Sequence, residues 1–370
     1  MNDTALFNKR NFFSALPIWP ARLLIAGLLL LMTYGIFVFD LSAHLSSQGK
    51  KGLDLACYKH IVERVRVGEG YYVAANTELT RQGYPTQSVF NWRLPFLAWA
   101  LGYIPNLIIA RVFAICLAFV PLLIWLEISR NELSFPLRAA GCLLMLGGPV
   151  YGFIDNLYFA HEFWCGILIV LSIFSYAKGW RRISLISGIS ALMIRELALP
   201  FIMVMLVLSY IERKFRETGF WVCGILAFFA VMVLHSIQVN TVTEHVQTAS
   251  INPWVTLAGW KFSLGTASMH PYLFLLPPWF TAVFVPATLF GLLGWNDVLG
   301  RRLAWTVSAY LVLFLFIGQS FNLYWGVIYV NLLPIGIIFT GRSMKDLYRS
   351  ACVDAGMCLR PKKRKEPSAP

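Results

Sequence analysis

A carboxylate and a phenol in one polar stretch are spaced to act together at a surface. Asp54, Tyr58, Ile61 and Val65 follow one another at steps of four, three and four within residues 52–67. Side chains at those steps share one face of a helix. The acid would then stand above an apolar stripe at a membrane interface, where it can meet a lipid headgroup as a reaction centre. The alternative is an ordinary helix N-terminal acid, which the helix dipole favours.

Ionisable residues also interrupt apolar sequence later in the chain. Arg195 and Glu196 stand between two apolar segments, and His161 and Glu162 begin another. Charges near a membrane are costly and tend to be paired or functional. We expect Arg195 to bind a phosphate and Glu196 to orient that phosphate or a neighbouring group. A polar turn that joins two short spans is the alternative.

The same polar stretch supplies cations and aromatic rings. Its cations, which a site for a negatively charged ligand would need, are Lys50, Lys51, Lys59, Arg64, Arg66, Arg81 and Arg93. Tyr84 and Trp92 belong to a dense set of aromatic residues, and Trp325 follows Tyr324 near the end of the apolar sequence. Rings at this density suit an interfacial belt, and they also suit stacking on a sugar.

Composition places these residues on a membrane scaffold. Hydrophobic residues make up 58% of the chain and charged residues 13%, and the mean hydropathy is +0.64. A soluble domain has about 25% charged residues. We therefore predict an all-α polytopic membrane protein with about ten transmembrane helices. The expected spans are 23–39, 107–128, 136–154, 163–177, 183–194, 197–211, 220–237, 272–294, 303–318 and 326–340.

Positive charge decides the predicted orientation. Lys and Arg gather at alternate ends of the spans, and these ends are expected to be cytoplasmic. The predicted parts are a cytoplasmic N-terminus (1–22), a transmembrane core (23–340) and a basic cytoplasmic tail (341–370). Within the core, a first outer loop with interfacial helices (41–106) and a second outer loop (238–271) lie on the opposite side. The net charge of +13 then reflects topology and tail, not a nucleic-acid surface.

Several function classes lack their sequence signals. The seven cysteines have no metal-ligand spacing and imply no disulfide framework. There is no phosphate-cradling glycine loop and no dinucleotide fingerprint, which argues against a cytosolic nucleotide as donor. The central spans carry almost no ionisable residues, which argues against an ion-coupled transporter.

Five short elements follow one another on the same predicted side. They are Asp54 with Tyr58; Gly68, Glu69 and Tyr72; Tyr84 with Pro85; Arg195 with Glu196; and Tyr324, Trp325 and Gly326. In this order they resemble the GT-C-fold membrane glycosyltransferases, and especially the polytopic mannosyltransferase-type families of bacterial envelope and polysaccharide synthesis. The resemblance covers about residues 20–340. Thr86 stands where the family often has a second proline, and the first loop lacks an Asp-x-Asp pair.

The resemblance implies transfer of a sugar from a polyprenyl-phosphate donor on the non-cytoplasmic face of a bacterial inner membrane, with inversion. The acceptor would be a lipid-linked glycan, a polysaccharide, a lipid or a protein. Asp54 would be the general base, and Glu162 a second acid/base or acceptor-binding group. The implied donor-phosphate ligands are Arg195, Arg93 and Lys59. The implied substrate-binding residues are Tyr58, Tyr84, Glu196, His161 and Trp325. No metal ligand is predicted, and a divalent cation, Mg²⁺ or Mn²⁺, is left open as cofactor.

Two other functions compete with this one. A flippase or other lipid or oligosaccharide transporter would call for internal repeats and polar residues near the midplane of the membrane. An envelope polysaccharide polymerase or ligase would place working Arg and His residues in a late loop, where His245 and His270 stand here. A structural membrane subunit is the remaining alternative.

Overall fold

The computed structural model describes residues 11–40, 52–86, 88–131, 133–243 and 255–352. This part of the chain is all-helical, and its only β pairing is an isolated bridge between Val255 and Ile317. The α-helices are α2 (Ile18–Val38), α4 (Gly52–Arg66), α5 (Tyr71–Arg81), α6 (Phe96–Tyr103), α7 (Leu107–Ile128), α8 (Phe135–Met145), α9 (Gly147–Val150), α10 (His161–Ala177), α11 (Arg181–Ile194), α12 (Leu199–Ile211), α13 (Phe215–Thr243), α14 (Gly259–Ala267), α15 (Pro271–Phe274), α16 (Pro278–Gly294), α17 (Val298–Phe316) and α18 (Ile337–Cys352). The 3₁₀ turns are η1 (Phe12–Ala15), η2 (Val89–Asn91), η3 (Tyr151–Phe153), η4 (Leu157–Phe159), η5 (Glu196–Ala198), η6 (Ser320–Ile328), η7 (Val330–Leu332) and η8 (Pro334–Gly336).

Four helices of the described chain, α2, α7, α13 and α17, are long and apolar enough to cross a membrane. A fifth crossing results if the pair 320–328 and 330–352, bent by 51°, counts as one span. Many large apolar side chains on these helices point outward, among them Leu30, Phe113 and Leu234, as lipid-facing residues do. The prediction of an all-α, membrane-type protein is therefore confirmed, whereas ten full-length spans are not established.

Several predicted spans are broken by glycine and proline. The expected span 136–154 divides at Gly147-Gly148-Pro149 into α8, α9 and η3. The expected span 326–340 divides into 3₁₀ turns, one of which begins at Pro334. Proline lacks the N–H that would continue a helix, and its ring clashes with the preceding turn. The length of an apolar segment alone does not reveal such breaks.

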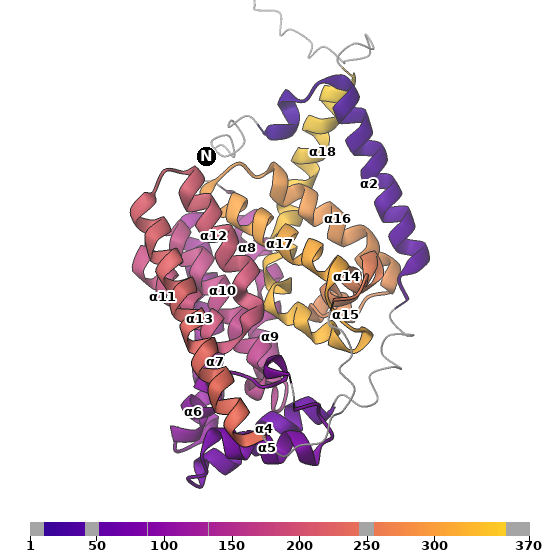
Figure 1. The fold of residues 1–370 in the computed structure, drawn as a ribbon. Coiled ribbons are helices and arrows are strands. Elements are labelled where there is room, and N and C mark those ends of the chain that lie inside the picture. The colour runs from indigo at the N-terminus through magenta and orange to yellow at the C-terminus, as the bar shows by residue number, and fades with distance from the viewer. Residues whose placement is uncertain (1–10, 41–51, 87, 132, 244–254, 353–370) are drawn as a thin grey trace, which may run out of the picture.

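The first outer loop folds into a helical cap at one end of the molecule. The helices α4, α5 and α6 lie together there, far from the end of α18 (Figure 1). Helix α13 runs past its predicted end at Ile237 and reaches this cap. Asn76 Nδ2 of α5 donates to the Val242 carbonyl at 3.1 Å, and Tyr72 Oη lies 3.0 Å from His235 Nδ1. The C-terminal part of α13 therefore packs against the cap and helps to hold it in place.

Helix α10 is the centre of the bundle. All of its residues except Leu168 and Ala177 are buried, and it packs on α7, α11, α17 and η6. Glycines allow the closest of these approaches. A Cβ on Gly166 would lie 2.5 Å from the Val327 carbonyl oxygen, and one on Gly326 would lie 1.9 Å from that of Thr266. Because small residues let backbones approach closely, η6 fits between α10 and α14.

The predicted second outer loop, 238–271, contains a buried helix in the structure. Residues 259–267 form α14, whose Phe262 and Leu264 are buried and which packs against α17 and η6. This segment is part of the core, not of an outer loop. Its small and polar residues made it look like a loop. His270 caps α15 by accepting from the Tyr272 N–H at 3.3 Å, and His245 lies outside the described residues.

The two ends of the described chain meet. Helix α2 packs on α16 and α18 (Figure 1), Arg22 Nε donates to the Ala351 carbonyl at 3.1 Å, and the rings of Phe13 and Phe290 stack at 4.1 Å. The predicted tail, 341–370, begins as part of α18, whose Leu347 and Ala351 are buried. Residues 353–370 lie outside the described chain.

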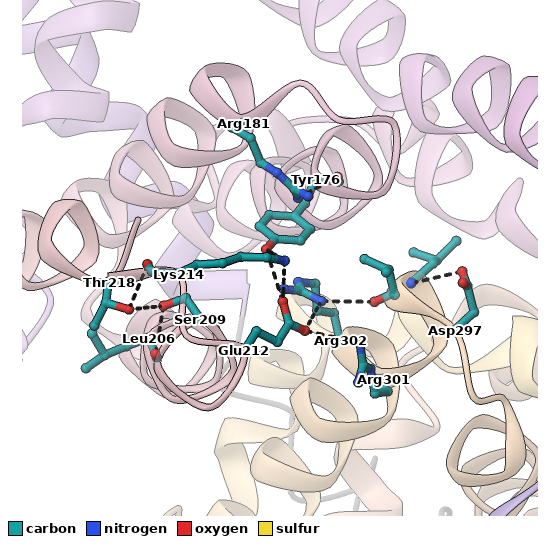
Figure 2. A network of polar contacts seen from close by, with 12 residues as sticks. Tyr176, Arg181, Leu206, Ser209, Glu212, Lys214, Thr218, Asp297, Arg301 and Arg302 are labelled. Carbon is teal, nitrogen blue, oxygen red and sulfur yellow. Dashed lines mark hydrogen bonds and ion pairs between the residues drawn. The ribbon is translucent and has the colours of Figure 1, made fainter. Parts of the chain in front are cut away.

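A polar cluster joins α10, α12 and α17 at the end of the bundle predicted to be cytoplasmic (Figure 2). Glu212 accepts from Arg302 Nη1 and Nη2 at 3.1 and 3.0 Å and from Lys214 Nζ at 2.5 Å. Arg181 and Arg302 stack on the Tyr176 ring, with Cζ 3.4 and 3.6 Å from its centroid. Since both are this close, they must occupy opposite faces of the ring.

We expect Glu212→Gln to lower the free energy of unfolding by about 3–5 kcal/mol, because Arg302 would remain buried without its anion. Burial alone would raise the Glu212 pKa, but the hydrogen bonds from Arg302 and Lys214 lower it to about 2. The carboxylate therefore stabilises the fold fully above the ordinary pKa of 4.5 and loses this effect as the pH falls toward 2. Thermal unfolding in detergent at several pH values measures both effects.

Glu127→Gln is the matched control. Glu127 pairs with Lys178 but is 59% exposed, and such surface pairs contribute about 0–1 kcal/mol. Equal melting temperatures for the two variants would contradict a structural role for the Glu212 cluster.

Candidate functional site

Asp54 stands in the first turn of α4 with a hydrogen-bond donor on its carboxylate. Tyr84 Oη donates to Asp54 Oδ1. Burial and the negative charge of Asp54 both raise the pKa of Tyr84, so the phenol stays protonated and keeps donating. Two hydrogen bonds hold the segment that follows Tyr84: Asn91 Nδ2 to the Pro85 carbonyl at 2.7 Å, and Trp92 Nε1 to the Thr86 carbonyl at 2.8 Å.

Arg93 ends this segment and points back at α4. Its Nε donates to Tyr58 Oη at 3.1 Å, and Tyr71 Oη donates to its backbone carbonyl. Burial raises the pKa of Tyr58, and the carboxylates of Glu162 and Asp54 add to this effect, which Arg93 opposes. Tyr58 is therefore a neutral phenol that lies within electrostatic reach of both acids. The exposed fraction of the Arg93 side chain is 11%, so this side chain keeps a small access to solvent.

A buried cation, Arg195, lies in the bundle next to these first-loop residues. Arg195, at the break between α11 and η5, has its Nε 2.9 Å from Glu162 Oε1 and its Nη1 2.5 Å from Glu196 Oε1. The exposed fractions of the Arg195 and Glu162 side chains are 1% and 2%. Glu162 lies in the first turn of α10, where the helix dipole favours a negative charge. Tyr310 Oη holds the break in place through a hydrogen bond to the Leu197 carbonyl at 2.8 Å.

The first-loop residues and the bundle residues are connected by one carboxylate and by ring contacts. Glu196 Oε1 lies 3.7 Å from Arg93 Nη1 and thus faces both arginines. The His161 ring contacts Tyr58 edge-on at 4.8 Å. The Trp325 ring lies 5.8 Å from the Arg195 guanidinium carbon. Seven predicted site residues from separate segments are therefore joined in one chain of contacts: Tyr58, Arg93, His161, Glu162, Arg195, Glu196 and Trp325. Asp54 and Tyr84 form a pair of their own that interacts electrostatically with Tyr58.

A small cavity opens beside these groups. Tyr58, Tyr71, Arg93 and His161 line it together with apolar side chains of α4, α5 and α6. Its volume is about 20 Å³, which is room for one or two water molecules. Both ring nitrogens of His161 are buried and have no hydrogen-bond partner within the described residues. A polar molecule bound in this cavity would contact the side chains of His161 and Arg93.

Most predicted cations of the first loop are used elsewhere. Lys59 pairs with Glu63 at 3.9 Å on the exposed side of α4, which does not support its predicted role at a donor phosphate. Arg64 and Arg81 both bind Glu78, at 2.8 and 2.6 Å. Arg66 donates to the carbonyls of residues 104 and 105, and Lys50 and Lys51 lie outside the described residues. Arg93 is the first-loop cation that reaches the site within the described chain.

Sequence reasoning missed two contributors. Glu78 neutralises Arg64 and Arg81, but α5 was not expected as a helix, so its register could not be assigned. Tyr324 was assigned to a membrane interface, yet its hydroxyl lies within electrostatic reach of Tyr58, Asp54 and Glu162. Its place beside Trp325 in the sequence was the available signal.

The cluster has the groups for acid–base chemistry beside a fixed cation. Asp54 can accept a proton, Arg93 can bind an anion, and Glu162 and Glu196 hold Arg195 in place. Arg195 forms ion pairs with both carboxylates, so its predicted phosphate role would place the phosphate in competition with them. The hydrogen bond within this group is the one to Glu196, because Arg195 Nε and both oxygens of Glu162 are buried without a hydrogen-bond partner in the described residues. Within the described residues no group of three or more His, Cys, Asp or Glu side chains is placed to hold a metal ion.

We expect Arg195→Met to destabilise the fold by about 3–5 kcal/mol, because it leaves Glu162 charged and buried without a cation. Adding Glu162→Gln should recover part of this loss, since the two residues are coupled. Thermal unfolding of both variants in detergent measures the effect. Lys59→Met, which removes an exposed partner of Glu63, should change the melting temperature little. Simple additivity of the two core substitutions would contradict the pair.

Comparisons with protein-family models, with curated proteins and with solved structures give no match to this chain, so its site has to be interpreted from its own geometry.

Proposed function

We propose that this protein is a membrane glycosyltransferase that moves a sugar from a polyprenyl-phosphate donor to an envelope acceptor. The acceptor is a lipid-linked glycan, a polysaccharide, a lipid or a protein. The observation that carries the proposal is that Asp54 and Arg93 of the helical cap and Glu162 of the apolar bundle all lie within electrostatic reach of one phenol, Tyr58. The reaction itself is the one that the sequence resemblance implies.

Asp54 is the proposed general base. It takes the proton of the acceptor hydroxyl as the acceptor oxygen bonds to the anomeric carbon, and the bond from that carbon to the phosphate oxygen breaks. Direct displacement inverts the anomeric centre. Tyr84 supports this role because its hydroxyl, bound to Oδ1, fixes the direction of the carboxylate.

Arg93 is the proposed ligand of the departing polyprenyl phosphate. Negative charge grows on this phosphate as the bond breaks, and a fixed cation stabilises it. Arg93 is partly open to solvent and lies 3.7 Å from Glu196, a looser ion pair than those of Arg195. A phosphate can therefore displace Glu196 from Arg93, whereas Arg195 keeps both carboxylates.

The cap has to move for this reaction. A cavity of about 20 Å³ cannot hold a sugar, so binding requires α4, α5 and α6 to shift away from the bundle. The proposal also includes ten membrane crossings in a bacterial inner membrane, with both termini cytoplasmic and the site on the periplasmic or outer face. The charge asymmetry along the sequence supports this topology.

Asp54→Asn should lower the rate of sugar transfer by a factor of about 10²–10⁴, the usual contribution of a general base. The assay uses the purified protein with a panel of polyprenyl-phosphate sugars and candidate acceptors. Asp155→Asn is the control, because Asp155 is an acid with an 83% exposed side chain outside the cluster. A well-folded Asp54→Asn protein that transfers sugar at the wild-type rate would remove Asp54 from the chemistry.

Tyr84→Phe should reduce transfer more mildly, by about fivefold, which corresponds to one hydrogen bond worth about 1 kcal/mol. The ring and its packing remain, so the melting temperature should change little. Tyr103→Phe, which alters an 82% exposed ring on α6, should have no effect on transfer. A loss as large as that of Asp54→Asn would instead mean that Tyr84 itself takes part in proton transfer.

A further inference from the structure

A cationic cavity lies at the end of α10 opposite the candidate site. It has a volume of about 520 Å³ and lies between the start of α11 and the turn that joins α12 to α13. Its cations are Arg181, Arg182, Arg213, Lys214 and Arg216, and Glu217 is the carboxylate among its lining residues. The charge on its wall is therefore strongly positive.

Two of these cations already have partners (Figure 2). Lys214 binds Glu212 at 2.5 Å and the Tyr176 hydroxyl at 3.0 Å. Arg181 donates to the Tyr176 carbonyl at 2.8 Å and stacks on its ring. In contrast, Arg182, Arg213 and Arg216 are exposed. No carboxylate in the described part of the chain pairs with these three.

The rest of the wall is apolar, with one unused donor. Phe215 and Phe220 are 63% and 49% exposed, although they belong to an apolar helix long enough to cross a membrane. Trp221 is 1% exposed, and its indole N–H has no hydrogen-bond partner within the described residues. Apart from Glu217, the cavity offers donors and cations, so it fits a ligand rich in acceptors.

The backbone at Arg213 adds a separate observation. Arg213 has φ of +56°, the left-handed conformation that glycine adopts at lowest cost. It ends α12 in a Schellman motif, in which Arg213 N–H donates to the Tyr210 carbonyl and Lys214 N–H to the Ser209 carbonyl, both at 2.9 Å. An arginine at a position that suits glycine indicates that the side chain itself is needed at this cavity.

We propose that this cavity binds the phosphate headgroup of an anionic membrane phospholipid. Arg182, Arg213 and Arg216 hold the phosphate, and the acyl chains lie along Phe215 and Phe220. Basic pockets at the ends of membrane helices suit such headgroups. The exposed rings favour a lipid over a soluble phosphate, because a soluble ion gains nothing from an apolar wall.

The proposal does not rest on the proposed function. Glu162 and Tyr176, at the two ends of α10, are about 21 Å apart at 1.5 Å per residue. The lipid site therefore lies far from Asp54 and Arg93, and each site can fail its test without the other.

The test is the melting temperature of the purified full-length protein in neutral detergent. We expect added phosphatidylglycerol to raise it by about 5 °C, and phosphatidylcholine or inorganic phosphate to leave it unchanged. Arg182→Gln combined with Arg216→Gln should abolish the rise. Arg130→Gln combined with Arg349→Gln removes the same charge from two exposed residues outside the cavity, and should keep it.

Equal rises in the wild type and the Arg182/Arg216 variant would overturn the proposal, as would no rise in the wild type. A rise with inorganic phosphate alone would assign the cavity to a soluble anion and reject a lipid. Arg213→Gly separates binding from folding damage: relief of the left-handed backbone should raise the lipid-free melting temperature, while the phosphatidylglycerol effect shrinks.

Discussion

The site is organised around a buried guanidinium that cannot exist there without its anions. Arg195 is 1% exposed, and a charge removed from water in this way is tolerated only when it is paired. This requirement brings the first turn of α10, which carries Glu162, to the break between α11 and η5, which carries Glu196. Glu196 in turn faces Arg93 on the cap. A constraint on one side chain thus fixes how three distant parts of the chain meet.

A second cluster of the same kind holds the opposite end of α10, where Tyr176 is sandwiched between Arg181 and Arg302. The central helix is therefore fastened by charge at both ends, and apolar packing and close glycine contacts fill the length between them. Such a bundle is a rigid support for the cap. The cap is attached through the ring contact of Tyr58 with His161, the ion pair of Arg93 with Glu196 and the extension of α13. Its buried apolar side chains also belong to the same hydrophobic core as those of the bundle. Movement during ligand binding is expected in the cap, because the cavity beside Tyr58 has room for only one or two water molecules.

Much of this arrangement follows from local sequence pattern. The helices at 52–67 and 107–128 were predicted because apolar period and breakers suffice for them, and several site residues were chosen because charges interrupt apolar sequence. Pairing could not be predicted in this way. Arg64, Arg81 and Lys59 resemble Arg93 in the sequence, and only the fold shows that Glu78 and Glu63 occupy the first three. The breaks within the apolar segments also escaped prediction, since an apolar segment broken at Gly147 has the same composition as an unbroken one.

The pairing of α2 with α16 and α18 has a consequence for how the chain is made. Helix α2 leaves the ribosome before the other apolar helices described here, whereas α16 and α18, which cover it, are synthesised much later. Until then it must wait in the lipid with a free face, because Phe13 and Arg22 find Phe290 and Ala351 only after those residues have been made. Contacts between such distant residues are slow to form. The packing of α2 is therefore complete only when α18 docks, and a chain interrupted before α18 would leave part of α2 uncovered for quality-control proteases to recognise.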